Sequence, residues 1–220
     1  RGYVKYENAW YRKHLNITGE DEGKRITLLF DGIATQSDIY VNGHIMKHNY
    51  CGYNPIEIDI TDVLEYDEAA VNVVAVYTNA EVHNGWWYEG GGICRHVWLQ
   101  KTEPICAETY GLYVLPEKIS ETEWNVLFTA SVLNETENQK TADLTFRLLD
   151  GETVIGQATE TVNINSYGKA EGKAKISVKA PRLWDVCDPY MYSADVIISA
   201  DGIECDKYKT KFGFRTFKFD

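Results

Sequence analysis

The sequence predicts an all-β fold. Between turn signals, apolar and polar residues mostly alternate with a period of two, as in strands that bury one face against a core. Turn dipeptides such as Asn42-Gly43, Asp150-Gly151 and Asp201-Gly202 separate these segments at short intervals. Almost no stretch has the period of an amphipathic helix. The chain is therefore expected to form sheets whose strands are joined by hairpins and short turns.

The first half of the chain contains short expected strands. Each is bounded by polar or glycine-containing turns, and together they are residues 10–17, 25–30, 37–41, 56–60 and 71–77. The last of them is almost wholly apolar and is expected to lie in the centre of a sheet. Thr61 is expected to cap a single helical turn over residues 61–64. Residues 93–99, which follow three glycines, are expected to form a strand that is buried on both faces.

The pattern changes near Glu103-Pro104, which predicts two domains, residues 1–102 and 103–220. After this point the strands are longer and the alternation is cleaner. The residues expected to face one core are Trp124, Val126, Phe128, Ala130, Val132, Leu144, Phe146, Leu148, Ile176, Val178, Tyr192, Ala194, Val196 and Ile198. Residues 208–219 are expected to form the closing strand. Strands at this spacing, in a segment of this length, favour an immunoglobulin-like β-sandwich.

Composition excludes several classes of function. The chain has 220 residues, 44% of them hydrophobic, and a net charge of −11. This charge argues against nucleic acid and an anionic membrane as partners, and no apolar run approaches the length of a membrane span. The sequence begins with Arg1 rather than Met, so a removed or omitted leader stays open.

Cysteine and histidine usage predicts neither a metal site nor a cofactor. The five cysteines are an odd number, are widely spaced and form no C-x-x-C motif. They are interpreted as reduced, mostly buried thiols, which predicts a cytoplasmic protein. His44 and His48 are four residues apart, but they lie beside the Asn42-Gly43 turn rather than on a helix, so they are not expected to bind a metal.

Six motifs follow one another over almost the whole chain. They are residues 10–13 (W-Y-R-K), 39–43 (I-Y-V-N-G), 51–56 with 59–62 (C-G-Y-N-P-I and D-I-T-D), 87–99 (W-Y-E-G-G-G-I-C-R-H-V-W-L), 181–184 with 188–192 (P-R-L-W and D-P-Y-M-Y) and 212–216 (F-G-F-R-T). Each motif alone is weak evidence, whereas their common order is specific. In that order they resemble the motifs of glycoside hydrolase family 2, which contains β-galactosidases, β-glucuronidases and β-mannosidases.

This resemblance implies a jelly-roll, galactose-binding-like β-sandwich followed by an immunoglobulin-like one. In the family, a (β/α)₈ barrel follows the F-G-F-R motif and carries both catalytic glutamates, whereas here only four residues follow Thr216. The acids of this chain are expected to lie on solvated strand faces and turns, so no catalytic residue is assigned and the chain alone is expected to be inactive. Its expected partners are a β-galactoside or β-glucuronide and its own C-terminal barrel; contacts within a homo-oligomer are an alternative.

The candidate substrate-binding residues are Asn84, Trp86, Trp87 and Glu89. They precede or enter the W-Y-x-G motif, where the family's loop can reach the barrel's pocket. Aromatic faces cover the C–H patches of sugars, and carboxylates and amides bond to hydroxyls. Packing is the competing interpretation for Trp87 and for Trp98, and contact with the barrel is the alternative for Trp86 and Glu89.

Three arginines have proposed partners. Arg95 is expected to pair with a buried acid such as Asp59, because an arginine in a strand needs a partner. Arg12 is given the same interpretation, with a surface pair as the alternative, and Arg215 is expected to brace the junction to whatever follows.

Three functions remain open at this point. The first is the non-catalytic N-terminal portion of a family 2 glycosidase, which shapes the substrate pocket and docks the barrel. The second is a stand-alone carbohydrate-binding module, and the third is a structural pair of β-sandwiches without a role in sugar binding, which would bury Trp86 and Trp87 fully.

Overall fold

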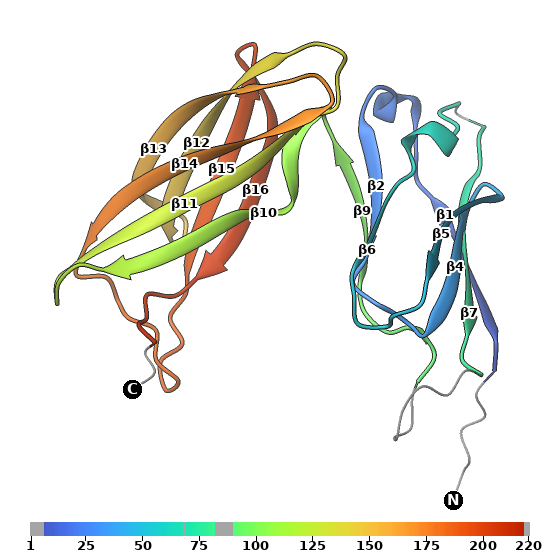
Figure 1. Ribbon diagram of the computed structural model, residues 1–220, viewed down its shortest axis with the longest axis horizontal. Coiled ribbons are helices and arrows are strands. Elements are labelled where there is room, and N and C mark those ends of the chain that lie inside the picture. Colours follow the sequence, from blue (N-terminus) through green and yellow to red (C-terminus); the bar gives the residue numbers. More distant parts are fainter. Residues whose placement is uncertain (1–6, 68, 82–89, 218–220) are drawn as a thin grey trace, which may run out of the picture. The chain divides into compact units, whose positions relative to one another are not determined.

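The computed structural model describes residues 7–67, 69–81 and 90–217. In this part of the chain the regular elements are strands and two short 3₁₀ turns, Gly19–Asp21 (η1) and Thr61–Val63 (η2), which confirms the all-β prediction (Figure 1). No helix in the described part is long and apolar enough to span a membrane. The chain divides into two compact units, Arg1–Lys101 and Thr102–Asp220.

The first unit is a sandwich of short antiparallel strands. One sheet has the order β1-β7-β4-β5, formed by Ala9–Leu15, Asn72–Asn79, Gln36–Val41 and His44–Asn49. The other has the order β6-β2-β9, formed by Ile56–Asp59, Arg25–Phe30 and Val97–Thr102. A small third pair joins β3 (Ile33–Ala34) to β8 (Gly92–Ile93). Alternate residues such as Ile26, Ile39 and Val76 point into the core between the two larger sheets.

The β4–β5 hairpin is fixed to the rest of this unit through two asparagines. Asn42 and Gly43 both have positive φ, 49° and 85°, as the predicted Asn-Gly turn requires. The Asn42 amide donates to the Asn72 side chain at 2.8 Å and to the Val63 carbonyl at 2.9 Å. Buried Asn72 in turn bonds both backbone groups of Glu65. Each of these polar groups is therefore satisfied inside the protein.

The predicted cap at Thr61 is wrong. Turn η2 begins after Ile60, and Thr61 lies inside it. The Thr61 hydroxyl instead donates to Asp59 Oδ1 at 2.7 Å and accepts the Ile26 N–H at 2.9 Å. The threonine therefore links the end of β6 to β2 rather than capping the turn.

The predicted strand over residues 93–99 is divided in two. Ile93 ends β8, and Val97 starts β9, which lies at the edge of its sheet and leaves Val97 and Trp98 exposed. The break follows from the partner strands, because β8 pairs with β3 whereas β9 pairs with β2, and β2 is separated from β3 by the turn at Asp31-Gly32. The expectation that this segment is buried on both faces is therefore wrong.

The second unit is a seven-stranded sandwich of immunoglobulin-like type. Its three-stranded sheet has the order β10-β11-β14, formed by Ile105–Lys118, Glu123–Asn134 and Gly168–Lys179. Its four-stranded sheet has the order β13-β12-β15-β16, formed by Thr153–Ile164, Lys140–Asp150, Tyr192–Ala200 and Ile203–Phe212. The final strand starts earlier and ends earlier than the predicted 208–219. Two sheets with these antiparallel connections match the predicted fold class.

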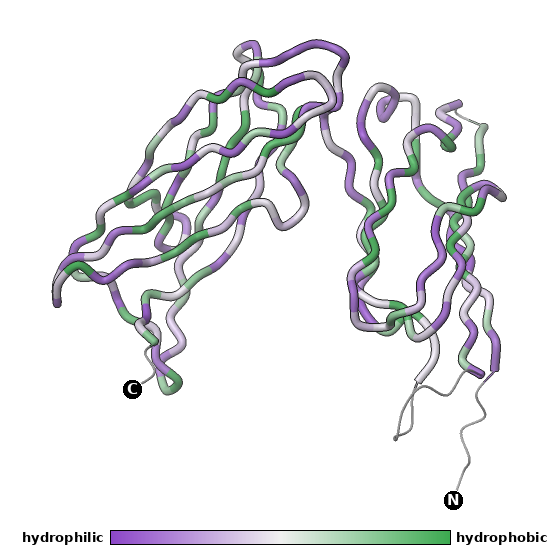
Figure 2. Tube along the Cα trace, viewed as in Figure 1, coloured by the Kyte–Doolittle hydropathy of each residue, from purple (hydrophilic) through white to green (hydrophobic). Residues whose placement is uncertain are grey.

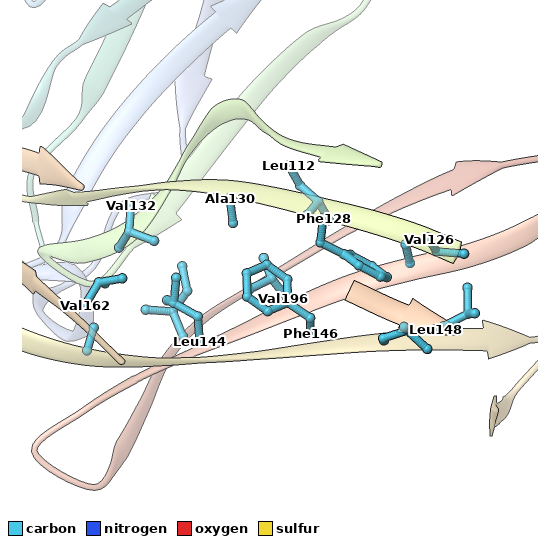
Figure 3. Packing of buried hydrophobic residues seen from close by; sticks show 14 of the residues in the cluster. Leu112, Val126, Phe128, Ala130, Val132, Leu144, Phe146, Leu148, Val162 and Val196 are labelled. Atoms are coloured by element: carbon cyan, nitrogen blue, oxygen red, sulfur yellow. The ribbon is translucent and has the colours of Figure 1, made fainter. Parts of the chain in front are cut away.

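The core of this unit follows the predicted alternation. Hydrophilic and hydrophobic residues alternate along its strands (Figure 2), and the apolar side chains of the two sheets point toward one another (Figure 3). Phe128 and Phe146 are almost fully buried and meet across the core, with ring centroids 5.6 Å apart. Buried Asn134 satisfies its side chain by donating to the carbonyls of Asn138, Ile164 and Asn165.

The cysteines are less buried than predicted. Cys106 is buried, but Cys51 and Cys205 are half-buried and Cys94 and Cys187 are exposed. Burial therefore does not account for most of these thiols, and the cytoplasmic location stays a prediction.

Candidate functional site

The four candidate sugar-binding residues, Asn84, Trp86, Trp87 and Glu89, lie outside the described residues, so their role stays a prediction. The structure describes the chain on either side of them. On one side β7 ends at Asn79, whose side chain accepts the Glu81 N–H at 3.0 Å. On the other side the glycines lead into β8.

The two flanks of this segment touch each other. A Cβ atom at Gly91 would overlap the Cβ of Ala80, so a side chain is excluded there by the opposite flank. A Cβ atom at Gly90, one position earlier, would have no neighbour within 4 Å among the described residues. The chain therefore leaves and re-enters the described part of the unit at adjoining points.

Gly92 fixes the second flank to the sheets. Its φ is +114°, and a Cβ there would overlap the hydroxyl of Tyr11 on β1. Its partner in the β3–β8 pair is Ala34, which also lies against Gly52. Three segments that are distant in sequence thus meet at small residues, which lets their backbones approach closely.

A polar and aromatic cluster follows directly along the chain. The Trp98 indole N–H donates to Asp31 Oδ2 at 3.1 Å, and His96 Nδ1 lies 3.8 Å from the same oxygen. The rings of His96 and Trp98 are 5.3 Å apart, and Arg95 donates to the Asp31 backbone carbonyl at 3.4 Å. Trp98 is 50% exposed, so its side chain is not part of the core of its own domain.

The predicted pairing of Arg95 with Asp59 is wrong. Asp59 pairs with Arg25 instead, because β2 and β6 are neighbours and Thr27 lies directly opposite Asp59. Arg12 makes no ion pair among the described residues; its guanidinium lies over the Trp10 ring, 5.1 Å from the ring centre. The participation of Asp31 in the Trp98 cluster was missed, because the sequence marks it only as a turn residue.

Two carboxylates are buried, contrary to the expectation that the acids face solvent. Asp195 receives two hydrogen bonds from Arg147, at 2.8 and 2.7 Å, and these bonds raise the pKa of Arg147. Burial tends to raise the pKa of Asp21, but hydrogen bonds from Lys101 and the Thr18 N–H, together with the charges of Lys101 and Lys24, hold it below its usual value. Both acids are held by cations, as in structural ion pairs.

One of the two histidines near the Asn42-Gly43 turn, His48, has a structural partner. His48 Nδ1 lies 2.5 Å from Asp38 Oδ1 on the neighbouring strand. No group of three potential metal ligands occurs among residues 7–67, 69–81 and 90–217.

The F-G-F-R and P-R-L-W motifs of the second unit meet around Trp184. Its N–H donates to the Phe214 carbonyl at 2.9 Å, and Leu183 forms a bridge with Phe214. A Cβ at Gly213 would lie 2.7 Å from the Trp184 Cβ, and the Arg215 guanidinium lies over the indole at 5.0 Å. The glycine thus allows the tryptophan to pack flat against the strand end, and the arginine covers it.

A hollow of about 710 Å³ opens beside this tryptophan. Its lining includes Leu115, Met191 and Phe217, which are exposed by 39%, 43% and 77%. Apolar side chains that line a hollow and are this exposed to solvent form a surface suited to contact with another polypeptide segment.

Two family models match the chain in the order of the two units. Residues 2–89 match the model described as glycosyl hydrolase 2 galactose-binding domain-like, and residues 110–215 match the model described as glycosyl hydrolases family 2. The chain belongs to glycoside hydrolase family 2.

Known members of family 2 resemble this chain over nearly all of its length. It is 34% identical to the β-galactosidase BoGH2A of Bacteroides ovatus, a match that covers 96% of this chain and 25% of the relative. It is 28% identical to a β-glucuronidase of Formosa agariphila, with 96% and 24% covered. The family 2 chain thus spans about a quarter of the length of these curated relatives.

Solved structures agree with this assignment. A family 2 glycosyl hydrolase from Bacteroides cellulosilyticus superposes with a TM-score of 0.90 at 30% identity, covering 96% of the family 2 chain and 29% of that structure. A family 2 β-glucuronidase gives the same TM-score at 26% identity, with 97% and 24% covered. The predicted succession of a galactose-binding-like and an immunoglobulin-like sandwich is confirmed.

Proposed function

We propose that this chain is the non-catalytic N-terminal portion of a retaining O-glycosidase of family 2. The observation that carries the proposal is the match of both units, in order, to a quarter of the length of relatives that are named as β-galactosidases and β-glucuronidases. No catalytic residue is assigned to the chain itself. The two carboxylates of a retaining site, the substrate and the activity belong to the whole polypeptide.

A β-galactoside is the first proposed substrate and a β-glucuronide the second. The relative with 34% identity is named for the first sugar and the relative with 28% identity for the second, so the difference is small. The two sugars differ in the configuration at C4 and in C6, which is a neutral hydroxymethyl group in galactose and a carboxylate in glucuronate. A comparison of matched aryl glycosides therefore separates them directly.

The proposed role of the first unit is to shape one wall of the substrate pocket with the segment around Trp86. Support comes from the flanks, since the Gly91–Ala80 contact and the Gly92–Tyr11 contact hold both ends of that segment on the sandwich. Fixed ends limit the positions that a connecting segment can reach, which favours a defined contact.

The proposed role of the second unit is to dock the catalytic barrel. Support comes from the apolar hollow beside Trp184, where Arg215 and Phe217 also lie on the lining. Covering such a surface with a barrel would remove apolar area from water, which is favourable.

The test compares the natural full-length polypeptide with the 220-residue chain. We expect the full-length protein to hydrolyse p-nitrophenyl β-galactoside or β-glucuronide, and the chain alone to hydrolyse neither. Trp86→Ala and Glu89→Gln in the full-length protein should raise KM, whereas Trp98→Ala, outside the predicted loop, should not. A full-length protein that is inactive on both glycosides, or unaffected by the loop substitutions, would remove the substrate or the pocket-wall role respectively.

A further inference from the structure

An aromatic cluster lies on the outer face of the four-stranded sheet of the first unit. Trp10 on β1 stands directly opposite Tyr77 on β7, and their ring centroids are 5.2 Å apart. Trp10 also reaches Tyr40 on β4, at 5.7 Å. Strands β1 and β4 flank β7 on opposite sides, so the contact between the two rings crosses β7. We call Trp10, Tyr40 and Tyr77 the outer aromatic platform.

The platform is held in place but is not covered. Trp10 is 51% exposed, although two tyrosines and one guanidinium touch it. The tyrosines lie on the half-buried side of their strands, opposite the residues that point into the core. A large apolar ring that is both fixed and exposed is organised for contact before any ligand arrives.

Two charged side chains, Arg12 and Asp38, lie beside the platform on the same face of the sheet. Arg12 follows Trp10 on the same face of β1, and Asp38 stands opposite Tyr77 in the next strand. Asp38 is engaged by His48, whereas Arg12 makes no ion pair among the described residues and lies over the Trp10 ring. The face therefore offers a cation that has no ion pair among the described residues, beside one exposed indole and two half-buried phenol rings.

These groups match the chemistry of an acidic sugar. The C–H face of a pyranose packs on an indole or phenol ring, and its hydroxyls bond to groups at the rim of the platform. A guanidinium binds a carboxylate with two parallel hydrogen bonds, which it cannot do with a single hydroxyl. A protein partner would more often meet a wider apolar area than these three rings provide.

We propose that the outer aromatic platform, with Arg12, is a non-catalytic binding surface for an oligosaccharide that contains a uronic acid. The sugar ring stacks on Trp10 and Tyr40, and its carboxylate lies at Arg12. This surface is formed by β1, β4 and β7 and includes none of the predicted residues of the 84–89 segment. Membership of family 2 supports only the choice of a carbohydrate as ligand, and the surface does not depend on the proposed catalytic role.

The test is calorimetric titration of the 220-residue chain with a hyaluronan tetrasaccharide, which contains glucuronate, and with the neutral chitotetraose. We expect millimolar or tighter binding of the acidic ligand and at least fivefold weaker binding of the neutral one. Trp10→Ala should weaken the acidic ligand at least tenfold. Arg12→Gln, which changes only an exposed side chain and keeps the fold, should remove the preference for the acidic ligand. Trp98→Ala is the matched control, because Trp98 is equally exposed and lies elsewhere.

Three results would overturn the proposal. Absence of binding to both ligands at 10 mM would remove the surface as a sugar site. Binding that is lost in Trp86→Ala but kept in Trp10→Ala would place the sugar on the predicted loop, which would leave the proposed function intact and reject this inference. A wild-type dimer that becomes monomeric in Trp10→Ala, measured by light scattering, would identify a second copy of the chain as the occupant.

Discussion

At the scale of single residues, the two glycines before β8, Gly90 and Gly91, differ in whether packing requires a glycine at that position. Gly91 lies against Ala80, so a methyl group added at residue 91 has no room unless the flanks move apart. A methyl group added at Gly90 would meet no atom of the described part of the chain within 4 Å. The three-glycine motif thus contains a position that packing requires beside one that packing does not.

Gly91→Ala should lower the free energy of unfolding of the first unit by about 1–3 kcal/mol, the usual cost of overpacking. Gly90→Ala should change it by less than about 0.5 kcal/mol. Urea unfolding followed by fluorescence measures both. In the double variant Gly91→Ala with Ala80→Gly, the clashing methyl group is removed and most of the loss should be recovered. Equal effects of the two single variants would show that the contact between the flanks is not tight.

Asp21 makes a pH-dependent contribution to stability. Its carboxylate accepts the Lys101 ammonium at 2.6 Å and the Thr18 N–H at 3.0 Å, and its pKa is lowered by these bonds despite burial. A lowered pKa in the folded state means that the stabilisation is fully present above the ordinary carboxyl pKa of about 4 and is lost as the pH falls through the lower folded value.

Asp21→Asn should therefore destabilise the chain by about 1–3 kcal/mol at pH 7, because the charge that holds Lys101 is removed. The difference from wild type should shrink as the pH is lowered below about 4. Denaturant titrations at pH 7, 5 and 3 measure this. Glu20→Gln, in the same turn but exposed, serves as control and should have little effect. A difference that grows toward low pH would contradict the assigned sign.

At the scale of elements, the side-chain pair between β12 and β15 is the clearest case of a buried charge. Arg147 stands directly opposite Asp195 in the antiparallel ladder, and Asp195 is 1% exposed. Lys207 Nζ on β16 lies 3.6 Å from the same carboxylate. The Arg147–Asp195 pair therefore joins β12 to β15, and Lys207, which stands opposite Ile197, adds a diagonal contact from β16.

Arg147→Met should cost about 3–5 kcal/mol in unfolding free energy, because it leaves the carboxylate buried with a single, more distant cation. The double variant Arg147→Met with Asp195→Leu should recover most of that loss. Chemical denaturation of the variants measures both. Lys140→Met, which removes an exposed pair with Asp201, is the control and should cost less than about 1 kcal/mol. If the single and double variants were equally destabilised, loss of packing would be the cause rather than an unpaired charge.

The strands also show which features could be predicted from the sequence and which could not. The faces of β11 and β12 were predicted, because alternation is local and a one-residue slip would expose Phe128 and Phe146 together. The partner of Asp59 was not, because it depends on the register between β2 and β6, which no local pattern encodes. The break at Cys94–His96 was missed for a related reason: it mirrors the turn at Asp31-Gly32 in a distant segment. The predicted sugar-binding residues remain a prediction that rests on the family resemblance.

At the scale of the whole molecule, each unit has its own core. The core of the first unit includes Ile39, and that of the second includes Phe128, both almost fully inaccessible to solvent. The two sets of buried residues share no member, and the division falls between Lys101 and Thr102. Because burial of apolar area is the main stabilising contribution, each unit is expected to unfold as its own cooperative transition.

This expectation predicts selective effects of core substitutions. Ile39→Ala should lower the stability of one transition by about 2–5 kcal/mol, and Phe128→Ala should lower the other by about 3–5 kcal/mol, because each leaves a cavity in a single core. Differential scanning calorimetry of the 220-residue chain measures both transitions together. Ile45→Ala, at a position that is 50% exposed, should shift neither. If both core substitutions shifted one common transition, the units would unfold together, and the stability of the first sandwich would depend on its immunoglobulin-like neighbour.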